Sequence, residues 1–82
     1  MGQTQLDEKI EVLARFKGGE VVPLFFKLSG RTYKIESIDL KYHFRQGGVD
    51  LYSYSVSSSG NSYKITYNAQ TLSWNLEEIF AS

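Results

Sequence analysis

The residues of this chain that could do chemistry are few. His43 is the only imidazole and there is no Cys, so no second His or Cys is present to complete a zinc site. Adjacent Glu77 and Glu78 would point to opposite faces of a strand, which does not suit paired acid–base catalysis. Two glycine pairs lack the following helix that a phosphate cradle needs. The sequence therefore predicts a protein that is not an enzyme and that holds no metal or cofactor.

Binding chemistry is better represented, because two stretches, "GRTYK" and "LKYHFR", interleave aromatic and basic residues. Small barrels hold single-stranded nucleic acid by stacking bases on aromatic rings flanked by Arg and Lys. One hypothesis is therefore a single-stranded nucleic-acid strip made of Arg31, Tyr33, Lys34, Lys41, Tyr42, His43 and Arg45. The tyrosines also fall at positions of core parity, so an ordinary structural role stays open. A net charge of zero gives no general attraction to nucleic acid.

A competing hypothesis is a protein interface at Leu13, Pro23 and Phe25. Proline has no N–H to donate, so the strand around Pro23 should be an edge, or at least unpaired on one side. Phe25 and Leu13 stand on the polar parity of their strands, and an open edge can accept a strand from a partner or from a second copy. This interpretation, a noncatalytic adaptor that binds a protein or forms a homodimer, stands slightly ahead of nucleic-acid binding.

The elements that must position these residues follow from apolar alternation. Residues 1–8 are polar and lack a period, which predicts a flexible N-terminus, and residues 9–82 form one domain. Ile10, Val12, Ala14 and Phe16 alternate with polar residues, as in a half-buried strand. Further strands are expected near residues 21–28, 31–45, 51–56, 62–67 and 72–76. Residues 75–82 could continue the last strand or form a helical turn.

Two features of residues 28–44 bear on the shape of the sheet. Ser29-Gly30 predicts a two-residue hairpin turn, since Gly accepts the positive φ that such turns require. The apolar phase then slips by one residue near Glu36-Ser37, which a β-bulge or sharp bend would absorb. After the slip, the parity of Leu40, Tyr42 and Phe44 is expected to face the core and that of His43 the surface.

Together these signals predict an all-β fold, a small antiparallel six-stranded meander closing into a barrel or half-barrel of SH3-like or OB-like type. Aromatic residues make up 15% of the chain, which suits a small core. No apolar run is long enough to span a membrane as a helix, and the absence of Cys suits a reducing compartment, so a cytoplasmic location is expected.

The stretch "PLFFKLSGRTYKI", followed by "LSWNLEEIF", resembles a family of short uncharacterised bacterial proteins with a domain of unknown function. The matching residues are Pro23, Phe26, Gly30, Arg31, Tyr33, Ile35, Trp74 and Leu76. Leu28 stands where that family often has Trp before the Gly-Arg turn. The family has no established activity, but some relatives are encoded near DNA-repair polymerase genes. The resemblance therefore implies a nucleic-acid or repair-protein context.

Overall fold

The computed structural model describes residues 2–81, and over this range the chain forms seven strands and no helix. The strands are β1 (Gly2–Lys17), β2 (Glu20–Leu28), β3 (Arg31–Lys34), β4 (Ser37–Gln46), β5 (Val49–Ser58), β6 (Asn61–Asn68) and β7 (Ser73–Ala81). The C-terminal segment, left open by the sequence, is therefore strand as far as Ala81. The predicted all-β class is confirmed.

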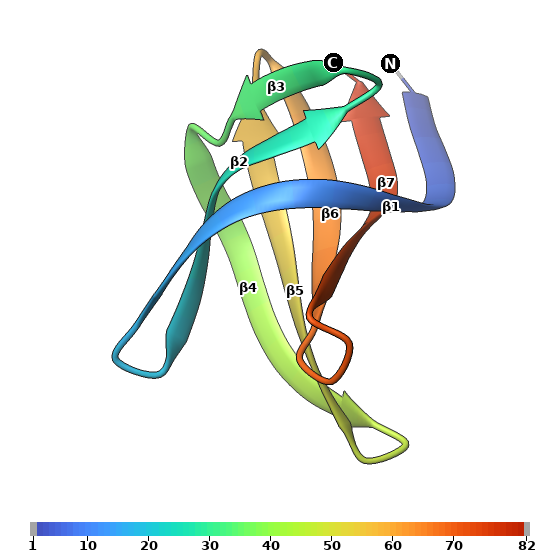
Figure 1. Ribbon diagram of the computed structural model, residues 1–82. Coiled ribbons are helices and arrows are strands. Elements are labelled where there is room, and N and C mark those ends of the chain that lie inside the picture. The colour runs from blue at the N-terminus through green and yellow to red at the C-terminus, as the bar shows by residue number, and fades with distance from the viewer. Residues whose placement is uncertain (1, 82) are drawn as a thin grey trace.

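Every pair of neighbouring strands is antiparallel, and the order in the sheet is β3-β2-β1-β7-β6-β5-β4. Figure 1 shows the sheet curling on itself, so that β1 and β2 pass over the inner face of β5 and β6. The result is a half-barrel, as predicted, with seven strands in place of six. β3 and β4 form the two edges of the sheet.

The first strand joins the two parts of the half-barrel. Residues from Gly2 to Ile10 pair with β7, whereas Glu11 to Lys17 pair with β2. A register shift between Gln5 and Glu8 bends β1 within the part that pairs with β7. The segment predicted as a flexible N-terminus is therefore strand from residue 2 onward, while Met1 and Ser82, at the ends of the predicted ranges, lie outside the described residues.

Two-residue turns connect most of the hairpins. Ser29 and Gly30 have φ angles of 52° and 78°, and Leu28 pairs with Arg31 across the turn. Positive φ at both central residues gives the twist that matches paired strands. The predicted hairpin is confirmed, and the turns at residues 18–19, 47–48 and 59–60 have the same backbone pattern.

The phase slip predicted near residues 36–37 is a corner between two strands. Residues 35–36 carry the chain from one edge of the sheet to the other, and their amides donate to Leu24 O and Ser57 O at 2.9 and 2.8 Å. A separate bulge between Ile38 and Leu40 then shifts the register of β4 against β5. The single bent strand expected for residues 31–45 is therefore two strands, β3 and β4.

After this bulge, the apolar residues of β4 lie on the outer face of the sheet. Leu40, Tyr42 and Phe44 are opposite Ser55, Ser53 and Leu51, and their exposed fractions are 57%, 48% and 43%. The prediction that their parity faces the core is wrong. His43, predicted at the surface, has a side chain that is 51% exposed, although it lies on the inner side of the edge strand.

The core lies between β1–β2 and the inner face of β5–β7. Its residues are Ile10, Phe26, Tyr54, Val56, Tyr63, Ile65, Tyr67, Trp74 and Leu76. Aromatic rings supply much of the buried area, as expected for a domain of this size. On the outer face, Ser53 and Thr66 are buried beside each other and share a hydrogen bond of 3.3 Å.

Candidate functional site

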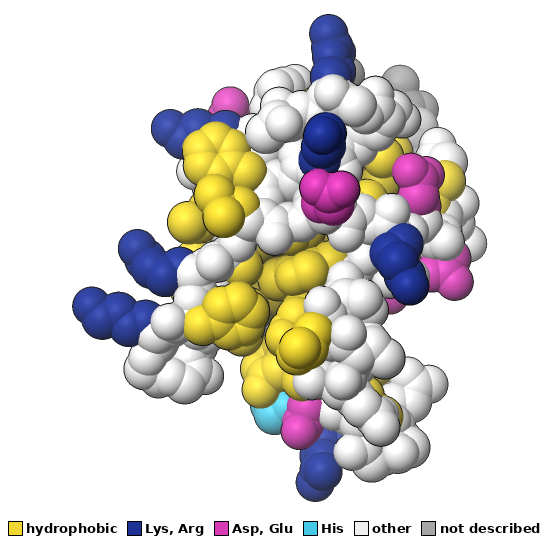
Figure 2. Space-filling view, in the orientation of Figure 1, with side chains coloured by type: hydrophobic (Ala, Val, Ile, Leu, Met, Phe, Trp, Pro, Cys, Tyr) yellow, Lys and Arg dark blue, Asp and Glu magenta, His cyan; other side chains and the backbone are white. Residues whose placement is uncertain are grey.

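A large hollow in the described part of the molecule is the groove beside β1. It has a volume of about 1180 Å³ and opens where β1 parts from β7 after Ile10. Figure 2 shows hydrophobic side chains gathered in the hollow on this face. The apolar wall of the groove is formed by Ile10, Val12, Phe16, Tyr67, Leu72 and Trp74.

Aromatic contacts fix the floor of the groove. The ring of Tyr67 lies 4.9 Å from that of Trp74, and the ring of Phe16 meets Tyr67 edge-on at 5.8 Å. Tyr67 and Trp74 are only 5% and 6% exposed, whereas Phe16 is 61% exposed. The two buried rings are held by packing on all sides, so they form a firm floor. Phe16 is packed on one side only, so the other side of its ring is accessible to a ligand.

The turn between β6 and β7 forms the opposite wall. The Asn68 side-chain oxygen accepts hydrogen bonds from the Gln70 and Thr71 amides at 2.9 and 3.0 Å, and the Leu72 amide donates to Asn68 O at 2.8 Å. These bonds fix the turn and place Leu72 at its end. The side chain of Leu72 is 72% exposed, and its φ is 59°. A left-handed backbone is unfavourable for Leu, so this turn presents an apolar side chain at an energetic cost.

The backbone of β1 contributes an open edge to the groove. Glu11–Lys17 pair with β2 on one side, and no strand among residues 2–81 pairs with their other side, because the pairing to β7 ends at Ile10. In an antiparallel strand, alternate residues direct their N–H and C=O groups to each side. The open side of β1 therefore offers a row of hydrogen-bonding groups directly beside an apolar wall.

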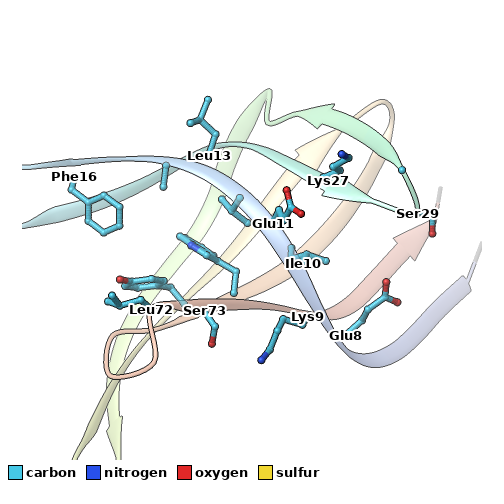
Figure 3. Close-up of a pocket in the computed structure, with 15 residues that line it drawn as sticks. Glu8, Lys9, Ile10, Glu11, Leu13, Phe16, Lys27, Ser29, Leu72 and Ser73 are labelled. Carbon is cyan, nitrogen blue, oxygen red and sulfur yellow. The ribbon is translucent and has the colours of Figure 1, made fainter.

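Charged side chains lie at one end of the groove only. Glu8, Lys9, Glu11 and Lys27 border the end next to the bend of β1, whereas Phe16 and Leu72 border the other end. Figure 3 shows Phe16 hanging from β1 toward Leu72, with Lys9 and Glu8 at the far end. The groove is thus apolar at one end and carries balanced charges at the other.

Two of the three residues predicted for a protein interface form a cross-strand pair. Leu13 on β1 lies opposite Phe25 on β2, and Figure 3 shows Leu13 pointing away from β7. Leu13 is 61% exposed and Phe25 is half-buried, so this pair is a second apolar patch, on the outer side of the hairpin.

The prediction that Pro23, the third residue, contacts a partner is wrong, because its side chain is fully buried. It pairs with Ala14 next to a register shift, and the pairing of β2 with β3 begins only at Phe25. Among residues 2–81, Pro23 therefore has no strand paired to its other side, as its missing N–H predicted. The bulge, however, turns its ring inward.

The residues predicted for a nucleic-acid strip are divided between two edges and two faces. Arg31, Tyr33 and Lys34 lie on β3, and the ring of Tyr33 stacks on the core residue Phe26 at 5.1 Å. The remaining four residues, Lys41, Tyr42, His43 and Arg45, lie on β4. Tyr42 points to the outer face, so the structure brings together only the three basic side chains of β4.

Each basic side chain of that group already has an acidic neighbour. Lys41 lies 3.7 Å from Glu20, and Asp50 lies 2.9 Å from His43 Nε2 and 3.3 Å from Arg45 Nε. The imidazole of His43 also stacks on Tyr52, with ring centroids 4.4 Å apart. The β4 strip is therefore an exposed set of paired charges around an aromatic stack.

Among the ionisable groups of residues 2–81, the phenol of Tyr54 has the most strongly shifted pKa. Burial, followed by the charges of Tyr52, Glu20 and Tyr67, raises the pKa of Tyr54 to about 12. Its hydroxyl donates a hydrogen bond to Val21 O, which joins β5 to β2 across the inside of the half-barrel. Because the phenol stays protonated and bonded, its contribution is structural.

Two residues of the groove were not singled out as binding residues from the sequence. Phe16 matched the core parity of β1, and it does contact the core, but one side of its ring is open. Leu72 was expected to begin the last strand, yet it lies in the turn before Ser73. Its apolar type directly after the turn residues "NAQT" is the one signal that could have drawn attention to it.

Comparisons of the chain with protein-family models, with curated proteins and with solved structures gave no match. The resemblance noted from the sequence therefore stays a prediction. Within residues 2–81, no helix is long and apolar enough to cross a membrane, and no group of three or more His, Cys, Asp or Glu is placed to hold a metal ion.

Proposed function

We propose that this protein is a noncatalytic interaction module that binds an extended segment of a partner protein in the groove beside β1. The observation that carries the proposal is the open backbone edge of Glu11–Lys17 next to the apolar wall around Phe16 and Leu72. Domains that capture extended peptides use the same combination: main-chain hydrogen bonds give affinity, and pockets for alternate side chains give specificity.

The dimensions of the groove suit a chain segment. Its volume of about 1180 Å³ is larger than the roughly 300–1,000 Å³ of most small-molecule pockets. The open edge from Glu11 to Lys17 is about 23 Å long at roughly 3.3 Å per residue, enough to pair with a segment of about seven residues. An added strand would continue the sheet from β1 over the floor of Tyr67 and Trp74.

The groove also indicates the chemistry of the partner. Every second residue of an added strand would point toward the floor. At the end bordered by Phe16 and Leu72, the partner would insert an apolar or aromatic side chain and cover two residues that are 61% and 72% exposed. At the end bordered by Glu11 and Lys27, polar side chains would be accommodated. The proposal includes a cytoplasmic location for the protein and its partner, as expected from the sequence.

The experiment is a selection of displayed random peptides on the 82-residue chain, followed by binding titrations of the enriched peptides on the variant Phe16→Ala. We expect enriched peptides with apolar residues at alternate positions. Binding should weaken at least about tenfold in Phe16→Ala, the scale of a loss of roughly 1.4 kcal/mol. Thermal melting of each variant checks that the fold is retained.

Leu13→Ala is the matched control for that experiment. Leu13 lies on the same strand, at the border of the groove, and has the same exposed fraction, 61%, but its side chain points away from β7 (Figure 3) and forms the outer patch with Phe25. The proposal requires that Leu13→Ala binds the selected peptides as the natural sequence does. Loss of binding in Leu13→Ala with retention in Phe16→Ala would move the interface to the outer patch, and failure to enrich any peptide would also overturn the proposal.

A second candidate function is single-stranded nucleic-acid binding at the β4 strip. It is favoured by Lys41, His43 and Arg45 sharing one face with Tyr52, on which His43 already stacks. Ion pairs with Glu20 and Asp50 reduce the charge available to phosphates, so this candidate ranks second. Titration with a fluorescent oligonucleotide at two salt concentrations tests it, because phosphate contacts weaken steeply with ionic strength.

A further inference from the structure

The outer face of the edge strand β4 carries an apolar row that the groove does not use. Leu40, Tyr42 and Phe44 follow one another at alternate positions and are 57%, 48% and 43% exposed. β4 pairs with β5 on one side, and no strand within residues 2–81 pairs with its other side. An edge strand of ten residues with exposed apolar side chains and no proline is a template for pairing with another strand.

We infer that β4 pairs antiparallel with β4 of a second copy of this chain, at a site separate from the groove. The bulge between Ile38 and Leu40 disturbs the start of the strand, so a pairing that is symmetric about Tyr42 is confined to Leu40–Phe44. In an antiparallel pair, residues opposite each other share a face. A two-fold axis at Tyr42 places Tyr42 opposite Tyr42 and Leu40 opposite Phe44, so the two rows become one continuous apolar surface.

The charges near β4 favour a second copy as the occupant. Inward-pointing cations usually protect an edge strand by repelling a like edge. Here Lys41 is paired with Glu20, and Arg45 is paired with Asp50, so two copies of the edge bring together neutral pairs. The whole chain also has a net charge of zero, which removes long-range repulsion between copies.

The available area sets the strength of the dimer. The exposed parts of the three side chains amount to roughly 300 Å² per copy, since a buried aromatic side chain covers about 150–250 Å². A standard stable interface buries about 800 Å² per partner, and the paired backbones and neighbouring side chains supply only part of the difference. The expected species is therefore a dimer that forms and dissociates with concentration.

Sedimentation equilibrium over a range of concentrations tests the inference. The natural sequence should rise from 9.4 kDa toward twice that mass. Leu40→Lys and Phe44→Lys, both at exposed outer positions, should raise the dimer dissociation constant at least about 100-fold. Phe16→Lys is the control: it places the same charge in the groove and should leave dimerisation unchanged.

Amide hydrogen exchange provides the second readout. In the dimer, alternate amides of Leu40–Phe44 should become protected as concentration rises. A natural sequence that stays monomeric at every concentration would overturn the inference, and so would a dimer that both row variants form equally well. A dimer without protection along β4 would overturn the edge pairing. The dimer is tested with Leu40→Lys and Phe44→Lys, and peptide binding is tested with Phe16→Ala. Failure of the dimer inference is therefore distinguishable from failure of the peptide-binding proposal.

Discussion

Replacing Leu72 by Asn should separate the stability of the fold from its binding function. Leu72 holds a φ of 59°, a left-handed conformation that costs most residues roughly 1–2 kcal/mol and that Asn adopts more readily. Its side chain is 72% exposed, so about a quarter of its surface is buried. At about 1.5–3 kcal/mol for burying a whole Leu, the lost burial amounts to roughly 0.4–0.8 kcal/mol.

The relief of strain therefore equals or exceeds the loss of burial in Leu72→Asn. We expect the free energy of unfolding to stay unchanged or to increase by up to about 1 kcal/mol, which for a domain of this size raises Tm by up to about 4–8 °C. Peptides selected on the groove should bind at least about tenfold more weakly, because one apolar wall is gone.

The assays are urea denaturation and a binding titration on the same preparation of Leu72→Asn. Leu76→Ala serves as the comparison for stability, because Leu76 is fully buried and its truncation should cost about 2–5 kcal/mol. A loss of more than about 1.5 kcal/mol in Leu72→Asn would refute the reasoning, since it would mean that the leucine is needed by the fold. Unchanged peptide binding would refute its role in the groove.

Three further predictions concern the surroundings of the groove and the β4 strip. Tyr54→Phe should cost about 1 kcal/mol at neutral pH, because Val21 O loses its donor. Since folding raises the pKa of Tyr54 from 10.0 to about 12, the natural sequence should also lose stability above pH 10, by up to about 1.4 kcal/mol per pH unit, and the variant should lack this slope in pH-dependent urea melts. Asn68→Ala should cost roughly 1–2 kcal/mol in thermal melts and weaken peptide binding, because two turn amides lose their acceptor. Because Lys41 forms an ion pair with Glu20, Lys41→Ala should leave the oligonucleotide affinity unchanged in a fluorescence titration. A loss of affinity would favour the nucleic-acid function.

The hairpin turns and the all-β fold class could be predicted from the sequence because both depend on neighbouring residues in the chain. Two-residue turns need positive φ at both central positions, and Ser29-Gly30 satisfies this in any context where the flanking residues alternate. The pairing of neighbouring strands follows from such turns. The predicted half-barrel rests on these signals together with the bend that the phase slip requires.

The inside and outside of β4 could not be predicted from its alternation. A period of two gives two faces without saying which one the rest of the chain covers. Here the bulge after Ile38 and the pairing of Tyr42 with Ser53 decide the matter, and both depend on β5. Pro23 shows the same limit: proline tolerates either an edge or a bulge, and the sequence does not say which applies.

The groove itself was beyond sequence reasoning because it arises from a change of partner along one strand. β1 leaves β7 at Ile10 and joins β2 at Glu11, so its open side exists only in the assembled sheet. Leu72 reaches the groove because the turn fixed by Asn68 holds it there. No periodicity in residues 9–17 or 68–73 reports either event.

The measurement that tests the central claim most directly is hydrogen exchange at the amides of Glu11–Lys17, followed by NMR with and without a peptide selected on the groove. The account predicts that alternate amides of this segment exchange freely in the isolated protein and slow at least about tenfold when the peptide binds. Exchange along β1 that does not change on binding, with new protection at Phe25 or along β4 instead, would contradict it.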